Sequence, residues 1–206
     1  MSITETELVV RTIAETAIAN ERYFGDLDSV VGDGDFGYSL ARGFERLLDG
    51  WEDLDRSSDG AFLKRTGMVL ASRIGGTSGP IWGTAFLRAG GAAEKGVVAM
   101  LRAAAEGIKA RGQSDVGDKT LLDALVPLTD RLETELAGGA TAAEAIRAAA
   151  GTAREAAGAT VGMVAKRGRA SYTGERSRGS ADAGAVAVAV LAESVSETWQ
   201  SRGVAS

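Results

Sequence analysis

The run TAAEAIRAAAGTAREAAGATVGMVA, residues 141–165, opens with the spacing of a capping box. In such a box Thr141 and Glu144 each accept a hydrogen bond from the other residue's backbone N–H group, which marks the first turn of a helix. The alanine-rich residues that follow predict one long helix that continues to about Ala165. Similar alanine- and leucine-containing segments, separated by clusters of glycine, recur along the chain.

Seven more segments place apolar residues at three- and four-residue steps, the spacing of one helix face. Thr4 and Glu7 predict a second capping box, at the start of the first segment. Pro80 suits the first position of a helix, whereas Pro127 lies inside one and predicts a kink or a break there. Asp182 can cap the last helix. The segments are 4–18, 40–51, 62–74, 80–87, 97–108, 121–132 and 182–199.

These patterns predict an all-α protein of about eight helices in one domain, since the only strand-like alternation, at 185–190, continues in a helical pattern.

The 206 residues carry a formal net charge of −5, which argues against nucleic acid as a partner because its binding needs a basic surface. The first residues do not resemble a signal peptide, and the longest apolar run, 183–192, is too short to span a bilayer. We therefore expect a cytoplasmic protein without a membrane partner.

The chain contains neither cysteine nor histidine. That composition excludes disulfides, thiol nucleophiles, zinc sites built from His and Cys, and a Ser-His-Asp triad on this chain. Any chemistry must use carboxylates, hydroxyls, Lys or Arg, backbone amides, or a hard metal ion bound by oxygen.

The segment LDSVVGDGDFG, residues 27–37, is the densest chemical signal. Asp28, Asp33 and Asp35 are interleaved with glycines, which allow the sharp turns that bring carboxylates together. Three convergent carboxylates repel one another unless a cation such as Mg²⁺ binds them. On spacing alone, a metal site and a solvated acidic turn are about equally supported. A dinucleotide fingerprint fails because no strand precedes it, and an EF-hand fails because Phe44 occupies the position of its final glutamate.

The residue composition of two further loops favours the binding of anions. The segment IGGTSGP, residues 74–80, places small residues and two hydroxyls before a helix, where backbone N–H groups favour anions. Alone it is better explained as a helix–helix turn, and it is neither a Walker A loop nor a nucleophile elbow. The segment 166–179 carries five cations on an acidic protein, so it is either a solvated loop or a strap whose arginines meet phosphate.

Taken together, the chain resembles the nucleotide-binding L subunit, or L domain, of dihydroxyacetone kinases. Four stretches carry the resemblance in the family's order and spacing, and it covers essentially the whole chain, residues 1–206. They are VGDGDFG at 31–37, GGTSGPIWG at 75–83, GDKTLLDAL at 117–125 and GRASYTGERS at 168–177.

The resemblance implies an eight-helix antiparallel barrel with the nucleotide site in the loops at one end. It places Asp28, Asp33 and Asp35 as ligands of two Mg²⁺ ions that hold the phosphates of ADP or ATP. It implies that these aspartates and Arg169 serve catalysis by charge neutralisation. The positions that it implies for nucleotide binding are Phe36, Gly37, Ser39, Thr77, Ser78, Gly112, Leu121, Arg169, Asp182 and Gly184.

The implied activity is that of a kinase subunit, which presents a nucleotide phosphate to dihydroxyacetone or a related ketose. A separate K-type subunit would hold the ketone covalently through its own histidine, and a phosphotransferase-system protein is a possible phosphoryl donor to bound ADP. Two alternatives stay open. One is an ADP-loaded regulatory module that docks onto a partner without turnover, and the other, weaker one is a module like those of fatty-acid kinases.

The chain departs from the family pattern at three positions. Phe36 stands where the family usually has His, Ser39 where it has Asn, and Ala183 where Pro is common. Because a phenyl ring cannot donate a hydrogen bond to phosphate, the first departure predicts weaker nucleotide binding or a site adjusted to another ketose.

Overall fold

The computed structural model describes residues 2–204, and these form nine α-helices and four 3-10 segments without a strand. The predicted all-α class is confirmed. The α-helices are α1 (Ile3–Ala19), α2 (Glu21–Ser29), α3 (Phe36–Asp49), α4 (Asp59–Arg73), α5 (Ser78–Gly91), α6 (Val97–Gly112), α7 (Leu122–Ala137), α8 (Ala142–Ala159) and α9 (Ala183–Val204). The 3-10 segments are η1 (Trp51–Asp53), η2 (Ala93–Lys95), η3 (Thr160–Gly162) and η4 (Arg169–Ser177).

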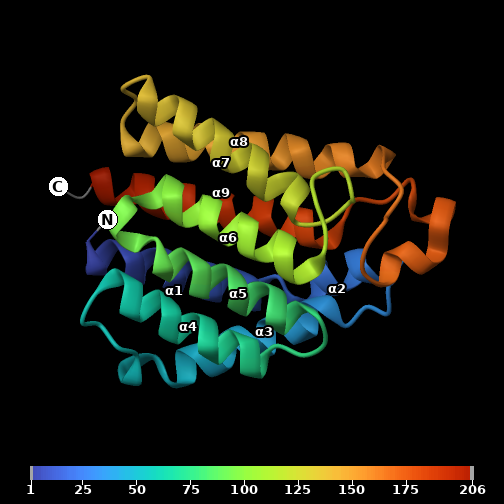
Figure 1. The fold of residues 1–206 in the computed structure, drawn as a ribbon, viewed down its shortest axis with the longest axis horizontal. Helices are drawn as coiled ribbons and strands as arrows, with labels where there is room; N and C mark the ends of the chain where they lie inside the picture. The colour runs from blue at the N-terminus through green and yellow to red at the C-terminus, as the bar shows by residue number, and fades with distance from the viewer. Residues whose placement is uncertain (1, 205–206) are drawn as a thin grey trace.

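The long helices run along the longest axis of the molecule, and their connections alternate between its two ends (Figure 1). The N-terminal helix begins, and the last helix ends, near one end. The connections α2–α3, α4–α5, α6–α7 and α8–α9 all lie at the opposite end (Figure 1). This arrangement brings four loops that are far apart in the sequence to one place.

Helix α9 explains the strand-like alternation at 185–190. Each of residues Ala185 to Ala189 is buried, because this part of α9 packs between α1, α2, α7 and α8. A helix surrounded in this way is apolar on every side, so its sequence loses the one-sided helical pattern. The largest fully buried side chains of the protein core include Phe24, Leu40, Phe44, Leu47, Phe62 and Leu70.

Helices α4 and α5 approach closely because glycines face each other in their contact. A Cβ atom on Gly67 would lie 2.7 Å from the carbonyl oxygen of Gly83, and one on Gly83 would lie 2.5 Å from the Cβ of Ala71. Larger residues there would push the two helices apart. The contact therefore requires glycine at both positions for α4 and α5 to lie this close.

A cavity of about 320 Å³ runs between α1 and the group of helices from α5 to α9, and its lining is almost wholly apolar. Ile81, Trp82 and Leu121 line both this cavity and a second one among the loops at one end of the molecule. The eight-helix antiparallel barrel remains a prediction. Residues 2–204 contain nine α-helices, one more than the sequence predicted, and the additional helix is α2.

The sequence did not predict helix α2, because only one of its side chains is fully buried. Its nine residues are mostly polar, and Phe24 alone is fully buried. Asn20 ends α1 and directly precedes α2, so no loop separates the two helices. A helix of nine residues with Phe24 and Leu27 as its only aliphatic or phenyl side chains is too short to show a clear helical period.

The capping box predicted at Thr4 and Glu7 is wrong, because the helix begins two residues earlier. Ser2 caps α1: its backbone N–H donates to Glu5 Oε2 at 2.8 Å, and the Glu5 N–H donates to Ser2 Oγ at 3.4 Å. Glu7 instead forms an ion pair with Arg56. The box at Thr141 and Glu144 is confirmed.

Three other predicted boundaries change. Helix α5 begins at Ser78 rather than Pro80, which still lies in the first turn, where no intrahelical N–H bond is needed. Helix α7 continues through Pro127 without a break. Helix α8 ends at Ala159, six residues before Ala165, because Thr160 Oγ1 donates to the Ala157 carbonyl at 2.6 Å and accepts from the backbone N–H of Asp182 at 2.9 Å. That side chain ties the end of α8 to the start of α9.

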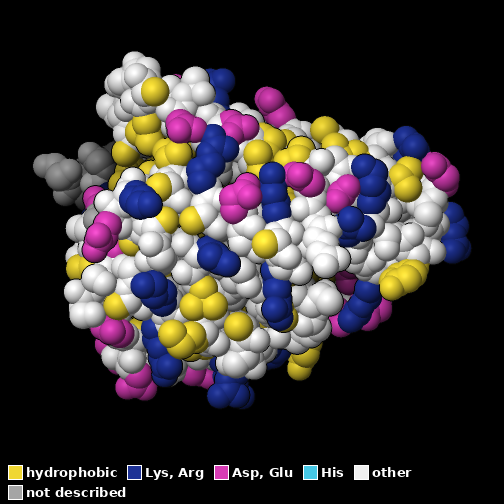
Figure 2. Space-filling model, viewed as in Figure 1, with side chains coloured by type: hydrophobic (Ala, Val, Ile, Leu, Met, Phe, Trp, Pro, Cys, Tyr) yellow, Lys and Arg dark blue, Asp and Glu magenta, His cyan; other side chains and the backbone are white. Residues whose placement is uncertain are grey.

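Charged side chains of both signs are interspersed over the face shown in Figure 2. No broad basic field of the kind that nucleic acid requires is visible on that face. None of the helices between residues 2 and 204 has the length and hydropathy of a membrane span.

Candidate functional site

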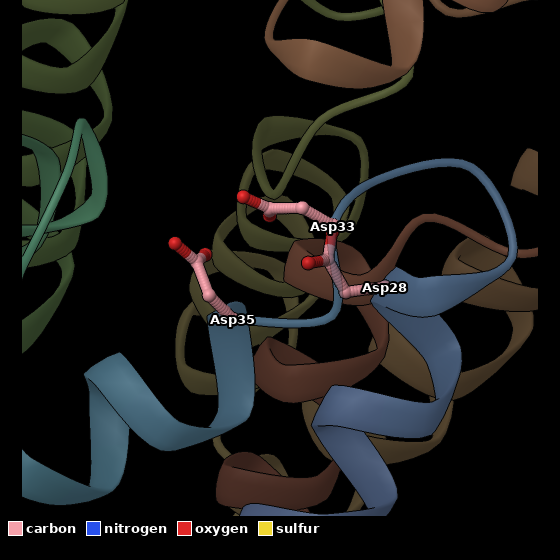
Figure 3. Close-up of side chains that lie close together, drawn as sticks. All are labelled: Asp28, Asp33 and Asp35. Atoms are coloured by element: carbon pink, nitrogen blue, oxygen red, sulfur yellow. The ribbon is translucent and has the colours of Figure 1, made fainter.

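Three carboxylates meet at the α2–α3 connection. Asp28 lies in the last turn of α2, Asp33 in the loop, and Asp35 directly before α3. One oxygen of each lies within 4.8 Å of the others, and the three side chains project to the same side of the loop (Figure 3). The predicted convergence is therefore observed.

Glycines and backbone amides explain why the loop folds back on Asp28. A Cβ on Gly32 would lie 2.3 Å from Asp28 Oδ1, and Gly34 has a φ of +77°, which L-residues rarely adopt. Asp28 Oδ2 accepts hydrogen bonds from the N–H groups of Gly34, at 2.9 Å, and Phe36, at 3.4 Å. Asp28 thus organises the loop as well as contributing a charge.

Asp33 and Asp35 have half-exposed side chains, 50% and 49%, and both form ion pairs with Arg169, the second at 3.1 Å. A guanidinium therefore supplies the positive charge that the carboxylates need. The donor set consists only of carboxylate oxygens, which suits a hard divalent cation such as Mg²⁺ and does not suit zinc, whose sites favour nitrogen and sulfur. The residues present fit the predicted magnesium.

The α4–α5 connection faces the carboxylates. Gly76 has a φ of +62°, and a Cβ there would lie 3.7 Å from an Arg169 guanidinium nitrogen, so this loop and the cationic segment are adjacent. Thr77 and Ser78 begin α5, whose first N–H groups have no partner within the helix. Such N–H groups, at the positive end of a helix of fourteen residues, favour an anion.

A cavity of about 200 Å³ joins these loops. Its walls come from residues 27–37, here called the carboxylate loop, from residues 74–80, here called the glycine loop, from the α6–α7 connection and from the residues before α9. The lining residues outside the carboxylate loop include Gly75, Gly76, Thr77, Ser78, Ile81, Trp82, Lys119, Thr120, Leu121, Arg167, Gly168, Arg169, Ala170, Asp182, Ala183 and Gly184.

Ten of the predicted site residues line this cavity, namely Asp28, Asp33, Asp35, Phe36, Thr77, Ser78, Leu121, Arg169, Asp182 and Gly184. Gly37, Ser39 and Gly112 are not part of its lining. A Cβ on Gly37 would lie 1.9 Å from the Glu21 carbonyl oxygen, so this glycine permits the close packing of α2 on α3. Ser39 packs against Gly75, and Gly112 ends α6 beside Ser114.

Phe36 lines the cavity and also packs inward. Its ring centroid lies 6.1 Å from that of the buried Phe24. The side chain thus anchors the carboxylate loop to the core, a role that the sequence alone did not indicate.

Burial governs the charges on the α6–α7 side of the cavity. Burial raises the pKa of Asp182 to about 7, and the nearby charge of Asp123 adds to the effect. The N–H of Ala185, which donates to Asp182 Oδ2 at 2.8 Å, and the charge of Lys119 both oppose the rise. The hydrogen bond from Ala185 confirms that Asp182 caps α9. Burial also lowers the pKa of Lys119.

Lys119 is the residue that sequence reasoning missed. It is 2% exposed and has a φ of +63°, and its ammonium donates to backbone carbonyls of Met163, Ser177 and Ser180. It belongs to the stretch 117–125 that carried the resemblance, but neither its burial nor its acceptors, 44 to 61 positions away, can be read from local sequence. Thr120 and Arg167 are further lining residues that were not singled out.

Comparison with known proteins identifies similar chains. The profile of the DAK2 domain matches residues 30–197. The ADP-binding subunit of the PEP-dependent dihydroxyacetone kinase of Escherichia coli is 36% identical over 197 residues, which cover 91% of this chain and 94% of that one. L-erythrulose 1-kinase of Mycolicibacterium smegmatis is 37% identical over 198 residues, but these span only 34% of its length.

A solved structure agrees with the sequence comparisons. The native dihydroxyacetone kinase of C. freundii superimposes with a TM-score of 0.76 at 26% identity, over 93% of this chain and 34% of that one. This chain therefore corresponds to about a third of that longer protein.

Proposed function

Because the chain belongs to the DAK2 domain family, we propose that it is the nucleotide-binding subunit of a dihydroxyacetone-type kinase. It would present a phosphate of a magnesium-bound nucleotide to a small ketone held by a separate K-type subunit. Relatives that match along nearly their whole length are named ADP-binding subunits of dihydroxyacetone kinases. The observation that carries the proposal is the convergence of Asp28, Asp33 and Asp35 beside the start of α5.

Each wall of the cavity has a role in this proposal. Asp28, Asp33 and Asp35 would hold two Mg²⁺ ions, which supply positive charge to phosphate oxygens and act as Lewis acids. The N–H groups at the start of α5, with Thr77 and Ser78, would bind phosphate oxygens. Arg169 would exchange its carboxylate partners for phosphate, which it can contact with two parallel hydrogen bonds.

The apolar side of the cavity is suited to a nucleoside. Ile81, Trp82 and Leu121 lie on that wall, behind the start of α5 and α7. A flat, partly apolar base needs such a surface, together with a few polar groups that set its orientation. We therefore place the phosphates at the carboxylate and glycine loops and the base towards Leu121.

The ketone would bind elsewhere, because this chain has no histidine that could capture a carbonyl. The subunit would contribute positioning and charge neutralisation, which are the main requirements of phosphoryl transfer. Relatives include enzymes named for dihydroxyacetone and for erythrulose, so the substrate belongs to the short ketoses.

The test combines the purified chain with a K-type subunit, dihydroxyacetone or erythrulose, and Mg²⁺. Two arms supply either ATP or catalytic ADP with a phosphotransferase donor, which is the source suggested by relatives named PEP- and PTS-dependent. Formation of the phosphate ester is followed by ³¹P NMR. We expect product only when both subunits are present.

Two outcomes would contradict the proposal. Ketone phosphorylation by the isolated, pure chain would refute the division between the subunits. Tight binding of ADP without product in either arm would instead support a regulatory module.

A further inference from the structure

The segment 163–180, here called the strap, carries Arg169 and has little apolar attachment to the rest of the molecule. Of its residues only Ala165 and Ser177 are buried, and Tyr172 is 89% exposed. Yet Arg169, near its middle, must stay beside Asp33 and Asp35. A segment whose only buried apolar side chain is one alanine needs another means of attachment.

Polar contacts close the base of the strap. The N–H of Gly179 donates to the Val161 carbonyl at 2.9 Å, and the N–H of Lys166 donates to the Asp118 carbonyl at 3.0 Å. Arg178 donates to the Gly162 carbonyl at 2.7 Å from an exposed position. Exposed bonds of this kind contribute little, because water replaces them readily.

Lys119 differs from these contacts because its ammonium is buried at the point where the strap begins and ends. Its Nζ lies 3.1 Å from the Met163 oxygen and 2.8 Å from the Ser180 oxygen, and it also donates to the Ser177 carbonyl. Three donors meet three acceptors, so no proton is left for a phosphate even though Lys119 lines the cavity. The positive φ of Lys119 is a strained conformation for a non-glycine residue, and it persists only where surrounding contacts enforce it.

We infer that Lys119 is a positioning residue, which joins the two ends of the strap and thereby holds Arg169 over the carboxylate loop. This inference adds a role for Lys119 to the proposed function. It rests on that function only in the experiments that measure nucleotide binding. A lysine that bound phosphate directly would instead contribute to nucleotide affinity independently of Arg169.

The first test is independent of nucleotide. Amide hydrogen exchange is measured for Lys119→Met, with the exposed Lys95→Met in η2 as a matched control. We expect amides within 163–180 to exchange at least tenfold faster in Lys119→Met, with the amides of α4 unchanged and Lys95→Met like the unmodified protein. Strap exchange equal to that of the unmodified protein would overturn the inference.

The second test is a double-mutant cycle of Lys119→Met and Arg169→Gln, with Mg-ADP affinity as the readout. Each single change should weaken binding about tenfold. If Lys119 acts through Arg169, the double variant should bind no more than about threefold more weakly than Arg169→Gln alone. Full additivity would overturn the inference. If the unmodified protein bound no Mg-ADP, the proposed function would fail while the exchange experiment still decided the role of Lys119.

A third variant covers the case in which Lys119→Met does not fold. Because the chain has no cysteine, Lys119→Cys introduces a single thiol. Alkylation of the denatured protein with 2-bromoethylamine forms a carbon–sulfur bond, releases bromide and gives a side chain of nearly lysine's length with a terminal ammonium. After refolding, the aminoethylated protein should recover slow strap exchange and Mg-ADP affinity. Alkylation of the same thiol with iodoacetamide, which adds no ammonium, should not, and equal recovery by both reagents would overturn the inference.

Discussion

At the carboxylate loop three anions lie together, two of them half-exposed, whereas across the cavity a single cation, Lys119, is buried among three carbonyls. The carboxylate loop contains more negative charge than its own residues can neutralise, and Arg169 of the strap forms ion pairs with two of the carboxylates. Lys119 is satisfied by uncharged acceptors that belong to the fold.

The contrast shows which charges are available for binding. An exposed carboxylate can exchange one cation for another at small cost, since water stabilises the intermediate arrangements. A buried ammonium cannot leave its acceptors without a large desolvation penalty. The carboxylate loop is thus suited to a ligand that comes and goes, and the Lys119 cluster to a permanent structural role.

The largest effect is expected at the carboxylate loop. Asp35→Asn should weaken Mg-ADP binding at least about a hundredfold, roughly 2.7 kcal/mol, while leaving the helix content intact. Removal of a half-exposed anion from a cluster of three also relieves repulsion, so stability without metal should not fall. Calorimetry and circular dichroism measure the two quantities. Asp49→Asn, at the far end of α3, is the matched control, and unchanged affinity in Asp35→Asn would refute the assignment.

Lys119→Met should show the opposite behaviour. Three carbonyls would lose their donor, which should lower the free energy of unfolding by about 2–3 kcal/mol. The loss should be the same with and without Mg²⁺, because Lys119 is not a metal ligand. Urea unfolding measures it, and a loss below about 0.5 kcal/mol would mean that the buried cation is not structural.

Asp182 sharpens the comparison because its carboxyl lines the same cavity as the carboxylate loop but has a raised pKa. Its pKa of about 7 in the folded chain lies above the value near 3.9 of an unfolded aspartate. Between these values the folded state binds more protons than the unfolded state, so the contribution of Asp182 to stability decreases as pH rises from about 4 to about 7.

Asp182→Asn cannot titrate at this position and should lack that decrease. Relative to this variant, the unmodified protein should lose at least about 1.4 kcal/mol, the equivalent of one pKa unit, between pH 4.5 and pH 7.5. Urea unfolding of both proteins at these two pH values gives the difference. A difference that is constant or that grows in favour of the unmodified protein would contradict the raised pKa of Asp182.

The smallest effect is expected at Phe36. His at this position could donate a hydrogen bond to a phosphate, and it should tighten Mg-ADP binding by up to about tenfold. The same change should cost some stability, because the Phe36 ring packs against Phe24. Nucleotide titrations of both proteins at fixed Mg²⁺ measure the gain. Equal or weaker binding by Phe36→His would show that Phe36 is no deficit.

The sequence predicted what depends on neighbouring residues. Asp28, Asp33 and Asp35 fall within eight positions, so their convergence follows from the glycines between them. The capping box at Thr141 is equally local. Both could be recognised without knowledge of the fold.

What escaped prediction depends on distant partners. Lys119 takes its role from acceptors at 163, 177 and 180, and Gly37 takes its role from the approach of α2, a helix that was itself not expected. Phe36 was identified by a missing donor, whereas its packing on Phe24 appears only in the fold. Long-range contacts of this kind leave no periodic pattern in the chain.

The most direct test of the account is calorimetric titration of ADP into the unmodified protein, once with Mg²⁺ and once with a chelator in its place. If the half-exposed carboxylates hold the metal through which the nucleotide binds, ADP should bind with Mg²⁺ and bind at least about a hundredfold more weakly without it, a difference of roughly 2.7 kcal/mol. Equal affinity under the two conditions would show that the carboxylate loop does not bind the nucleotide through a metal, and the central claim would fail.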